Sequence, residues 1–590
     1  MKPERVVRLI VFIAGAALLI TLIAMAVTVL SGLVGILALL VTALLSLVVM
    51  RLLGRRVPRG TTLEVDLDSG VIEKVGSDPI SRATSRNAVV VRDVVDALTR
   101  AASDDRVTGL VIRLGNGGIQ LGHAQELRDA VRMFRQAGKK TVAFSEAFGE
   151  SRLATVDFYL ACAFEQVFLQ PRGVASIQGM LAKGRFVRGV FDKLGIVPDF
   201  DHRKEYKAAM YTLTEREFTE PHREATAAVA GDQFDQIVTG IAKDRGLDEG
   251  SVAALIDRSP LTVQEILDAG LVDRLGYRDE AYQAAKENGS GFMFHDHYLK
   301  RAGRPHRKGT RIGLVYGTGS INRGSSSFDP LTRGPSLGAD DVAKAIRSAV
   351  DDDKVKAIVF RVDSPGGSAV ASEVVRREVV RAQEAGKPVV VSMGNVAGSG
   401  GYWISTNAER IIAQPGTITG SIGVVSGKLA NREAWARLGI TFDEIGFGRN
   451  ATFESSQDVY TESERERLET ILDTIYRDFT GLVATSRGLE PEHVEGIARG
   501  RIWTGAQASR NGLVDGLGGM EMAIESVKEV AGIDPDQPVE LRLFPRKRAL
   551  PLPERRTSSE PVRDAFSAIF GAVDNLAGAV TGIQLRMPGG

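Results

Sequence analysis

The 590-residue chain contains one pattern twice, and this repeat limits the possible fold more than any other feature of the sequence. VTGLVIRL at 107–114 corresponds to VKAIVFRV at 355–362, and QAGKKTVAF corresponds to EAGKPVVVS, both 248 residues further on. DRGLD and AGLVDRLG recur in the same order as SRGLE and NGLVDGLG, 242 residues further on. Single hydrophobic cores stop growing at about 250 to 300 residues, so two copies of one domain fit this length.

Each copy alternates runs rich in β-branched residues with amphipathic stretches, as in AIVFRV, SEVVRREVVRAQEAG and PVVVSM. This order predicts strand, helix and strand, and therefore α/β units with parallel sheets. We place the first copy at 60–300 and the second at 312–545, with a basic linker containing Gly and Pro at 301–311. The tail, 546–590, contains AFSAIFGAVDNLAGAV, which predicts one amphipathic helix.

The segment 1–58 has the character of a membrane anchor, because the chain from Leu9 to Met50 carries no charged residue. One straight helix of this length would extend about 63 Å at ~1.5 Å per residue, roughly twice the thickness of a bilayer core. Two transmembrane helices, 9–30 and 33–53, fit better. Basic residues flank both ends of the apolar run, so the positive-inside tendency predicts a hairpin that leaves the remaining chain in the cytoplasm.

Composition excludes some classes of partner and site. The 74 basic residues balance 73 acidic ones, so no net field attracts a nucleic acid. Cys162 is the only cysteine, which rules out an intramolecular disulfide and a cysteine zinc cluster. None of the seven histidines stands in a zinc-binding spacing such as HExxH, and we expect neither a metal nor another cofactor.

The two copies differ in their glycine-rich loops. The second copy carries DSPGGS at 363–368 and NVAGSGGYW at 395–403, where the first copy has LGNGGIQ and EAFGESRLATVDFY. Glycines on both sides of Ser399 allow a tight turn into a helix start, where free N–H groups face a reacting oxygen. The Gly400 N–H, with that of Gly366 or Gly367, would then form an oxyanion hole. A glycine-rich turn without chemistry is the alternative.

The copies differ again at Lys207. EYKAAMYTLTEREFTE at 205–220 matches GRNATFESSQDVYTE at 448–462, and Lys207 falls opposite Asn450. The second copy has the serine and the first has the lysine, which suggests one active site shared by both. A lysine acts as a base only when burial or cationic neighbours lower its pKa from about 10.4. An exposed helix lysine is the alternative, and His202 is the other candidate base.

These motifs resemble peptidase family S49, the signal peptide peptidases in their long form. The resemblance rests on SMGNVAGSGGYWIST and GTITGSIGV, with DSPGGS and YKAA, and extends over about 60–545. It implies a Clp protease/crotonase-like fold in each repeat and a homotetramer that cleaves hydrophobic remnant signal peptides. It also assigns the nucleophile to Ser399, the base to Lys207 and the oxyanion site to Gly366, Gly367 and Gly400. Ser421, in TGSIG, either orients the lysine or has a structural role.

Two features depart from that family. Its members have one N-terminal span and an active site outside the cytoplasmic membrane, whereas the hairpin would place the catalytic domain inside the cell. The lysine segment continues as YKAAMYTLT instead of YKSAVEPF, which leaves the substrate preference open.

We therefore expect a serine endopeptidase of the cell membrane with a Ser-Lys dyad. Its expected partners are hydrophobic peptides, membrane lipid and further copies of itself. A crotonase-like acyl-CoA enzyme and a catalytically silent membrane scaffold are the alternatives.

Overall fold

The computed structural model describes residues 12–25, 42, 56–76, 85, 87–286, 291–329 and 334–545. The chain divides into two units, Met1–Pro58 with Lys300–Ala302, and Arg59–Leu299 with Gly303–Gly590. Residues 12–25 are helical, but most of the predicted spans 9–30 and 33–53 and the tail 546–590 lie outside the described residues. Among the helices that the structure describes, none has the length and apolar character needed to cross a bilayer. The transmembrane hairpin and the tail helix therefore stay predictions.

The first repeat forms a six-stranded sheet in which all neighbouring strands are parallel. The strand order is β8-β6-β5-β4-β1-β9. The strands are β1 (Thr61–Asp66), β4 (Val107–Arg113), β5 (Lys140–Ser145), β6 (Gln166–Leu169), β8 (Arg274–Leu275) and β9 (Phe292–Phe294).

The second repeat forms a parallel sheet with the same order, β20-β16-β15-β14-β10-β21. Its strands are β10 (Thr310–Thr318), β14 (Val355–Ser364), β15 (Val389–Gly398), β16 (Arg410–Ala413), β20 (Gly516–Leu517) and β21 (Val539–Leu543). A branch adds β17 (Ile418–Gly420), parallel to the end of β15, and β19 (Ile502–Thr504), antiparallel to β17. The shared order confirms the predicted duplication of a parallel α/β unit, whereas the residue boundaries of the two domains stay a prediction.

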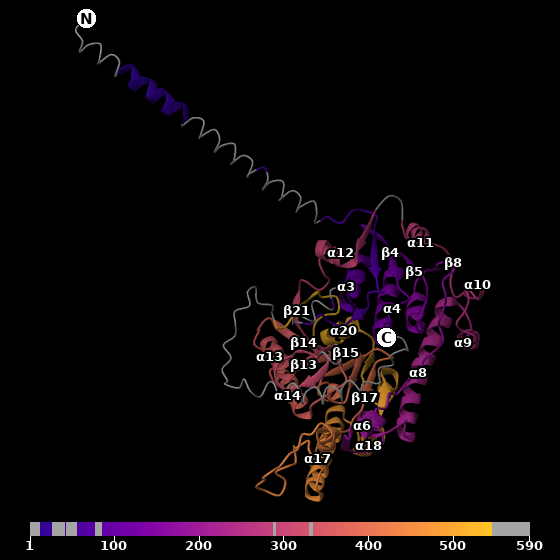
Figure 1. The fold of residues 1–590 in the computed structure, drawn as a ribbon. Coiled ribbons are helices and arrows are strands. Elements are labelled where there is room, and N and C mark those ends of the chain that lie inside the picture. The colour runs from indigo at the N-terminus through magenta and orange to yellow at the C-terminus, as the bar shows by residue number, and fades with distance from the viewer. Residues whose placement is uncertain are drawn as a thin grey trace. The chain divides into compact units, whose positions relative to one another are not determined.

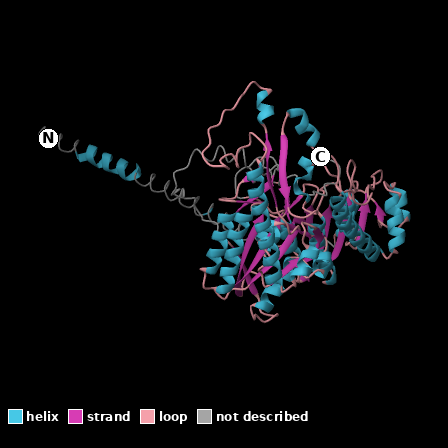
Figure 2. Ribbon diagram, turned by 90° about the horizontal axis from the view of Figure 1, so that it is seen from below, coloured by secondary structure: helices cyan, strands magenta, loops and turns pink. Residues whose placement is uncertain are grey.

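Helices cover both faces of the sheets (Figure 2). Successive side chains of a strand point to opposite faces. In β14, Ile358 and Phe360 accordingly belong to the core under α13 (Ala339–Val350) and α14 (Ala369–Glu384), whereas Val359 belongs to the core under α20 (Met520–Val530). In the first repeat the corresponding helices are α3 (Val91–Ala102), α4 (Leu121–Gln136) and α11 (Arg278–Ala285).

The remaining elements are short, apart from two long helices. The helices of 26 residues are α8 (Glu220–Arg245) and α17 (Glu462–Arg487) (Figure 1). The short helices are α5 (Thr155–Ala161), α6 (Arg188–Leu194), η1 (Ala208–Met210), α7 (Tyr211–Thr214), α9 (Glu249–Asp257), α10 (Val263–Asp268), α12 (His295–Ala302), α15 (Gly400–Trp403), α16 (Arg432–Ala436), α18 (Pro491–Ile497) and α19 (Gly505–Arg510). The short strands are β2 (Val71–Ile72), β3 (Val89–Val90), β7 (Val197–His202), β11 (Ser320–Asn322), β12 (Phe328–Asp329), β13 (Gly334–Gly338) and β18 (Val425–Ala430).

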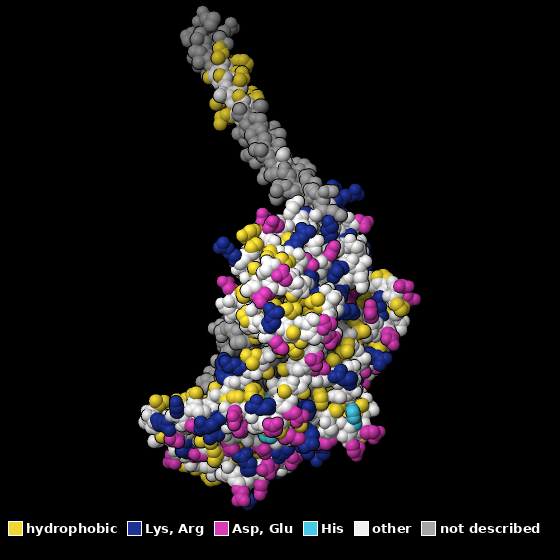
Figure 3. All heavy atoms as spheres, turned by 90° about the vertical axis from the view of Figure 1, so that its right-hand side faces the viewer, with side chains coloured by type: hydrophobic (Ala, Val, Ile, Leu, Met, Phe, Trp, Pro, Cys, Tyr) yellow, Lys and Arg dark blue, Asp and Glu magenta, His cyan; other side chains and the backbone are white. Residues whose placement is uncertain are grey.

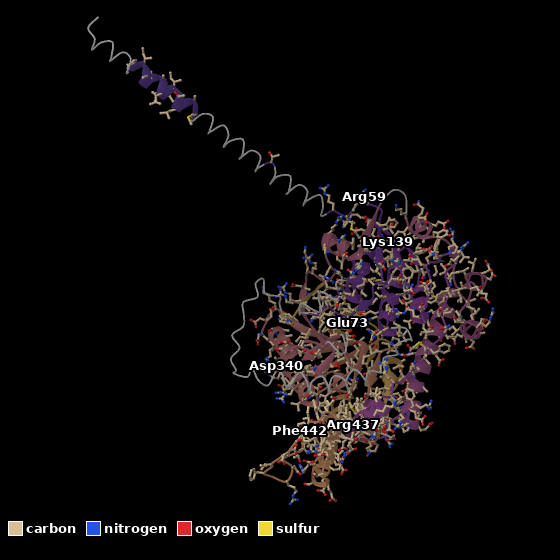
Figure 4. All side chains as sticks on the ribbon, viewed as in Figure 1. Arg59, Glu73, Lys139, Asp340, Arg437 and Phe442 are labelled. Carbon is tan, nitrogen blue, oxygen red and sulfur yellow. The ribbon has the colours of Figure 1, made fainter. Side chains whose placement is uncertain are left out.

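Many contacts join the repeats within the larger unit, and two of them bear on the position of the site. The first is an antiparallel pair formed by β7 of the first repeat and β18 of the second. The second is a buried ion-pair network, in which the Arg361 guanidinium on β14 binds the carboxylates of Glu73 and Glu126 at 2.8 and 2.7 Å. Glu73, labelled in Figure 4, comes from the segment after β2, and Glu126 lies on α4. A single strand of the second repeat is thus held by two elements of the first.

The surface carries no large area of one charge on the face shown in Figure 3, where basic and acidic side chains are interspersed. This distribution agrees with the balanced composition and gives no basic patch on that face for a polyanion.

Candidate active site

Ser399 occupies a sharp turn between a strand and a helix. It follows the last residue of β15 and immediately precedes α15, as the glycine pattern predicted. Its backbone has φ 54° and ψ −120°, a conformation that costs energy for a residue with a side chain. Its N–H donates to the Gly420 carbonyl oxygen at 2.8 Å, which holds the turn against the end of β17. A strand–turn–helix arrangement of this kind exposes the nucleophilic serine in α/β-hydrolases.

Lys207 reaches Ser399 from the first repeat. The pairing of β7 with β18 brings the segment after β7 beside the residues that precede β18. The Lys207 Nζ lies 3.0 Å from the Ser399 Oγ, although the two residues are 192 positions apart. Only 4% of Lys207 is exposed, and this burial lowers the pKa of its amine to about 7. The structure therefore excludes the alternative of an exposed helix lysine.

Ser421 completes the surroundings of the amine. The Lys207 Nζ donates to the carbonyl oxygen of Ser421 at 2.8 Å and contacts its Oγ at 3.0 Å. Ser421 has a φ of 51°, and its own N–H donates to the Arg501 carbonyl oxygen at 2.8 Å. Two polar atoms of one residue thus fix the direction of the amine toward Ser399.

The three predicted glycines lie beside Ser399. A Cβ added to Gly366, which has a φ of 103°, would stand 2.7 Å from the Gly400 nitrogen and 2.8 Å from the Ser399 Cβ. The Gly366 N–H donates to the Ser364 Oγ at 3.2 Å. For the N–H groups of Gly367 and Gly400, no acceptor is found in the described part of the chain. These two N–H groups are therefore available to a bound oxygen.

Two further glycines enclose the lysine, and the sequence analysis did not identify them. A Cβ added to Gly500 would stand 2.5 Å from the Lys207 nitrogen and 2.6 Å from its Cα, and one added to Gly423 would stand 3.2 Å from its Cδ. The Gly500 N–H donates to the Ile422 carbonyl oxygen at 2.7 Å, and the Tyr206 N–H donates to the Arg499 carbonyl oxygen at 3.1 Å. Residues of the second repeat thus surround and desolvate the lysine of the first.

The other candidate base, His202, is engaged elsewhere. Its Nε2 lies 3.1 Å from the Tyr211 hydroxyl and its Nδ1 lies 2.9 Å from the Lys204 carbonyl oxygen.

The corresponding place in the first repeat differs from the Ser399 turn. Ala154 precedes α5 there, with φ −123° and ψ 24°, so this place holds no hydroxyl. The hydroxyl of the next residue, Thr155, donates to the Gly179 carbonyl oxygen at 2.9 Å.

One group of described side chains has donor atoms close enough to hold a metal ion. These atoms, from Glu73, His123 and Asp363, lie within 4.8 Å of one another. Both carboxylate oxygens of Glu73 accept from Arg361, at 2.8 and 2.9 Å. Although burial raises the pKa of Glu73, Arg361 and His123 hold it below its usual value. The negative charge of Glu73 is therefore already neutralised by Arg361.

Known proteins match this chain over most of its length. The family model described as peptidase family S49 matches residues 133–290 and 381–534, one segment in each repeat. "Protease 4" of Salmonella typhi is 32% identical over 457 residues, which cover 74% of this chain and 72% of that protein. "Serine protease SPPA, chloroplastic" of Arabidopsis thaliana is 27% identical over 549 residues, which cover 91% of this chain and 78% of that protein.

Among solved structures, a mutant of ClpP1 from Listeria monocytogenes matches 36% of this chain and 95% of its own, with 16% identity and a TM-score of 0.23. That score is too low to establish a shared fold, so the Clp protease/crotonase-like assignment stays a prediction. The family match covers more than half of the chain and falls on both repeats. The chain therefore belongs to peptidase family S49 and is a serine peptidase.

Proposed function

We propose that this peptidase works through a Ser-Lys dyad, with Ser399 as nucleophile and Lys207 as general base. The distance of 3.0 Å between the Lys207 Nζ and the Ser399 Oγ is the main support for this proposal. Burial supports it too, because an amine with a pKa of about 7 is partly neutral at physiological pH and can accept a proton.

The reaction would begin when the neutral Lys207 amine takes the proton of the Ser399 hydroxyl. The Ser399 Oγ attacks the carbonyl carbon of the peptide bond, and the N–H groups of Gly367 and Gly400 stabilise the resulting oxyanion. The Lys207 ammonium then gives its proton to the leaving amine as the C–N bond breaks, which leaves an acyl ester on Ser399. Water, deprotonated by Lys207, hydrolyses this ester and restores both side chains.

Ser421 would orient the lysine and Gly366 would shape the oxyanion site. The contacts of the Lys207 Nζ with the Ser421 carbonyl oxygen and Oγ favour rotamers that point the amine at Ser399. The backbone of Gly366 passes too close to Gly400 and Ser399 for any side chain at this position. Both residues thus act by positioning other groups.

The proposed substrates are hydrophobic peptides, such as signal peptides that remain after their release. The resemblance of the sequence to signal peptide peptidases supports this class. The uncharged run from Leu9 to Met50 supports an anchor in the cell membrane, in contact with lipid, and the resemblance further favours a homotetramer. Protease protection in sealed and opened cells would decide between an extracytoplasmic and a cytoplasmic catalytic domain.

The dyad is tested by cleavage of a fluorogenic hydrophobic peptide by the full chain in detergent. Ser399→Ala and Lys207→Ala should each lower kcat/KM by at least about 100-fold, since general base catalysis contributes roughly 10² to 10⁴ in rate. Lys243→Ala, at an exposed position on α8, is the matched control and should retain the native rate. Native activity of Lys207→Ala would exclude the dyad, and a native chain that cleaves no hydrophobic peptide would contradict the proposed substrate class.

A further inference from the structure

The segments β7 and β18, which pair within the chain, each have a counterpart in the other repeat. These two counterparts do not pair with each other. In the contact, Val197 pairs with Ala430 and His202 pairs with Val425. An offset of 244 residues superimposes Leu-Gly-Ile at 194–196 on Leu-Gly-Ile at 438–440, and the start of α6 on the start of α16. With the same offset, the counterpart of β7 is 441–446 in the second repeat, and the counterpart of β18 is 181–186 in the first.

Both counterparts are described by the structure, and neither belongs to a strand or helix. Over the described residues 180–186 and 441–447, no backbone N–H donates a hydrogen bond to another group of the chain. One carbonyl in them, that of Phe442, accepts from the Arg432 guanidinium at 3.2 Å. Segments of this kind present a row of free donors, to which another strand can pair. The two segments therefore have the open edges that a pair like β7–β18 requires.

Several large apolar side chains around 441–446 are exposed, as expected of a contact face without its partner. In the first repeat, Phe191 and Ile196 pack in one cluster with Val425 and Leu429 of β18. Their counterparts in the second repeat, Trp435 and Ile440, are exposed. Ile445 and Phe447 are 89% and 93% exposed, and the labels of Arg437 and Phe442 mark this part of the molecule in Figure 4. A contiguous group of large apolar side chains on the surface indicates an interaction site.

We infer that residues 441–446 of one copy of this chain pair, antiparallel, with residues 181–186 of a second copy. The contact would repeat between chains what β7 and β18 form within each chain, and it would join copies head to tail. It would be the contact by which the homo-oligomer proposed above forms, and it rests on that part of the proposed function.

The register of the inferred pair brings opposite charges together. Phe200 lies opposite Gly427 in the pair within the chain. Their counterparts between chains are Glu444 and Lys183, which are both exposed in the single chain. Opposite charges in facing cross-strand positions stabilise a pair, whereas like charges there destabilise it. A second copy of this chain is thus a chemically matched occupant of the exposed segment.

Disulfide trapping tests the register directly. The full chain in detergent, carrying Lys183→Cys and Glu444→Cys, should form covalently linked multimers under mild oxidation, and reductant should release them. The only native cysteine, Cys162, is buried, so its background is low. The matched control pairs Glu444→Cys with Lys243→Cys on exposed α8 and should give no such linkage. Linkage no greater than that of the control would overturn the inference.

Charge reversal gives a second measurement, which does not need a disulfide. Light scattering of the detergent-solubilised full chain should give a multimer for the native protein. Lys183→Glu should lower the mass toward that of one chain, and adding Glu444→Lys should restore it. If the native protein is a multimer and neither substitution changes its mass, the inferred contact is wrong but the proposed homo-oligomer is not. If the native protein is a monomer, the contact and the homo-oligomer are both wrong. Peptide cleavage, measured on the same samples, reports on the dyad separately.

Discussion

At the scale of single residues, the environment of Lys207 decides whether the site can work. A lysine with an ordinary pKa would be protonated at neutral pH and could accept no proton. Here Gly423 and Gly500 of the second repeat pack against the lysine, and burial of the side chain lowers the pKa of the amine to about 7. The two serines beside the amine carry no charge, so they do not oppose its neutral form.

The first prediction concerns the pH dependence of peptide cleavage. Because only the neutral amine of Lys207 can take the proton of Ser399, kcat/KM should rise with pH along a single titration with a midpoint of about 7. The rate should be low at pH 5 and reach a plateau before pH 9. Initial rates with one hydrophobic peptide between these limits measure this curve. A rate that rises only near pH 10 would mean that the lysine is not desolvated in solution.

The second prediction concerns Gly500. The Cβ of Gly500→Ala would stand within 2.6 Å of the Lys207 backbone, so the two segments must move apart and admit water. We expect kcat to fall and the midpoint of the pH profile to rise by about one unit or more, toward the ordinary pKa of lysine. Gly496→Ala, whose Cβ would meet no atom within 4 Å, should leave both unchanged.

Gly423→Ala gives a second change at the same place, because its Cβ would stand 2.9 Å from the Gly500 Cα and 3.2 Å from the Lys207 Cδ. This variant keeps the prediction testable if Gly500→Ala does not fold. Loss of activity in both variants with the pH midpoint unmoved would show that these glycines serve only the fold.

At the scale of elements, three connections assemble the site. The turn from β15 to α15 contains Ser399, and the β7–β18 pair positions Lys207 beside it. The chain between α18 and β19 packs against the lysine. Behind them, Arg361 joins β14 to Glu73 and to Glu126 on α4. β14 leads directly into the glycine loop that contains Gly366, so this network holds the strand that precedes the proposed oxyanion site.

The third prediction concerns that network. Arg361 is 1% exposed, so Arg361→Leu would leave two carboxylates buried without their cation. Breaking a buried ion pair in this way typically costs about 3 to 5 kcal/mol of folding free energy. Arg377→Leu removes a pair on the exposed face of α14, where the change in folding free energy should be small. Urea denaturation of the two variants measures the difference, and equal midpoints would contradict the proposed role of the network.

The elements also show how far the sequence could predict the structure. The strands β14 and β15 and the helix α14 were predictable, because a strong hydrophobic period appears twice along the chain. The start of a helix after Ser399 was predictable from its glycines. The β7–β18 pair was not, because two short strands from distant segments carry no shared pattern. Gly500 was missed for a similar reason, since its requirement comes from a tertiary contact with Lys207 and not from any local motif.

At the scale of the whole molecule, the two repeats form related halves, and each contributes one residue of the proposed dyad. Each repeat keeps the same parallel sheet, so the scaffold did not change when the loops diverged. The second repeat keeps the strained serine turn, while the first keeps the lysine and has Thr155 at the start of the corresponding helix. The comparison of the copies indicated this division from the sequence, and the arrangement in space places both groups at one point.

The sharing of one dyad by the two repeats is tested most sharply by the rate at which a fluorophosphonate labels the full chain, with the modified residue located by peptide mass spectrometry. We expect labelling at Ser399 in the native protein, and a rate at least about 100-fold lower in Lys207→Ala, since the base that activates the serine is gone. Lys243→Ala should be labelled at the native rate. Labelling at another serine, or native labelling of Ser399 in Lys207→Ala, would contradict a dyad shared between the repeats.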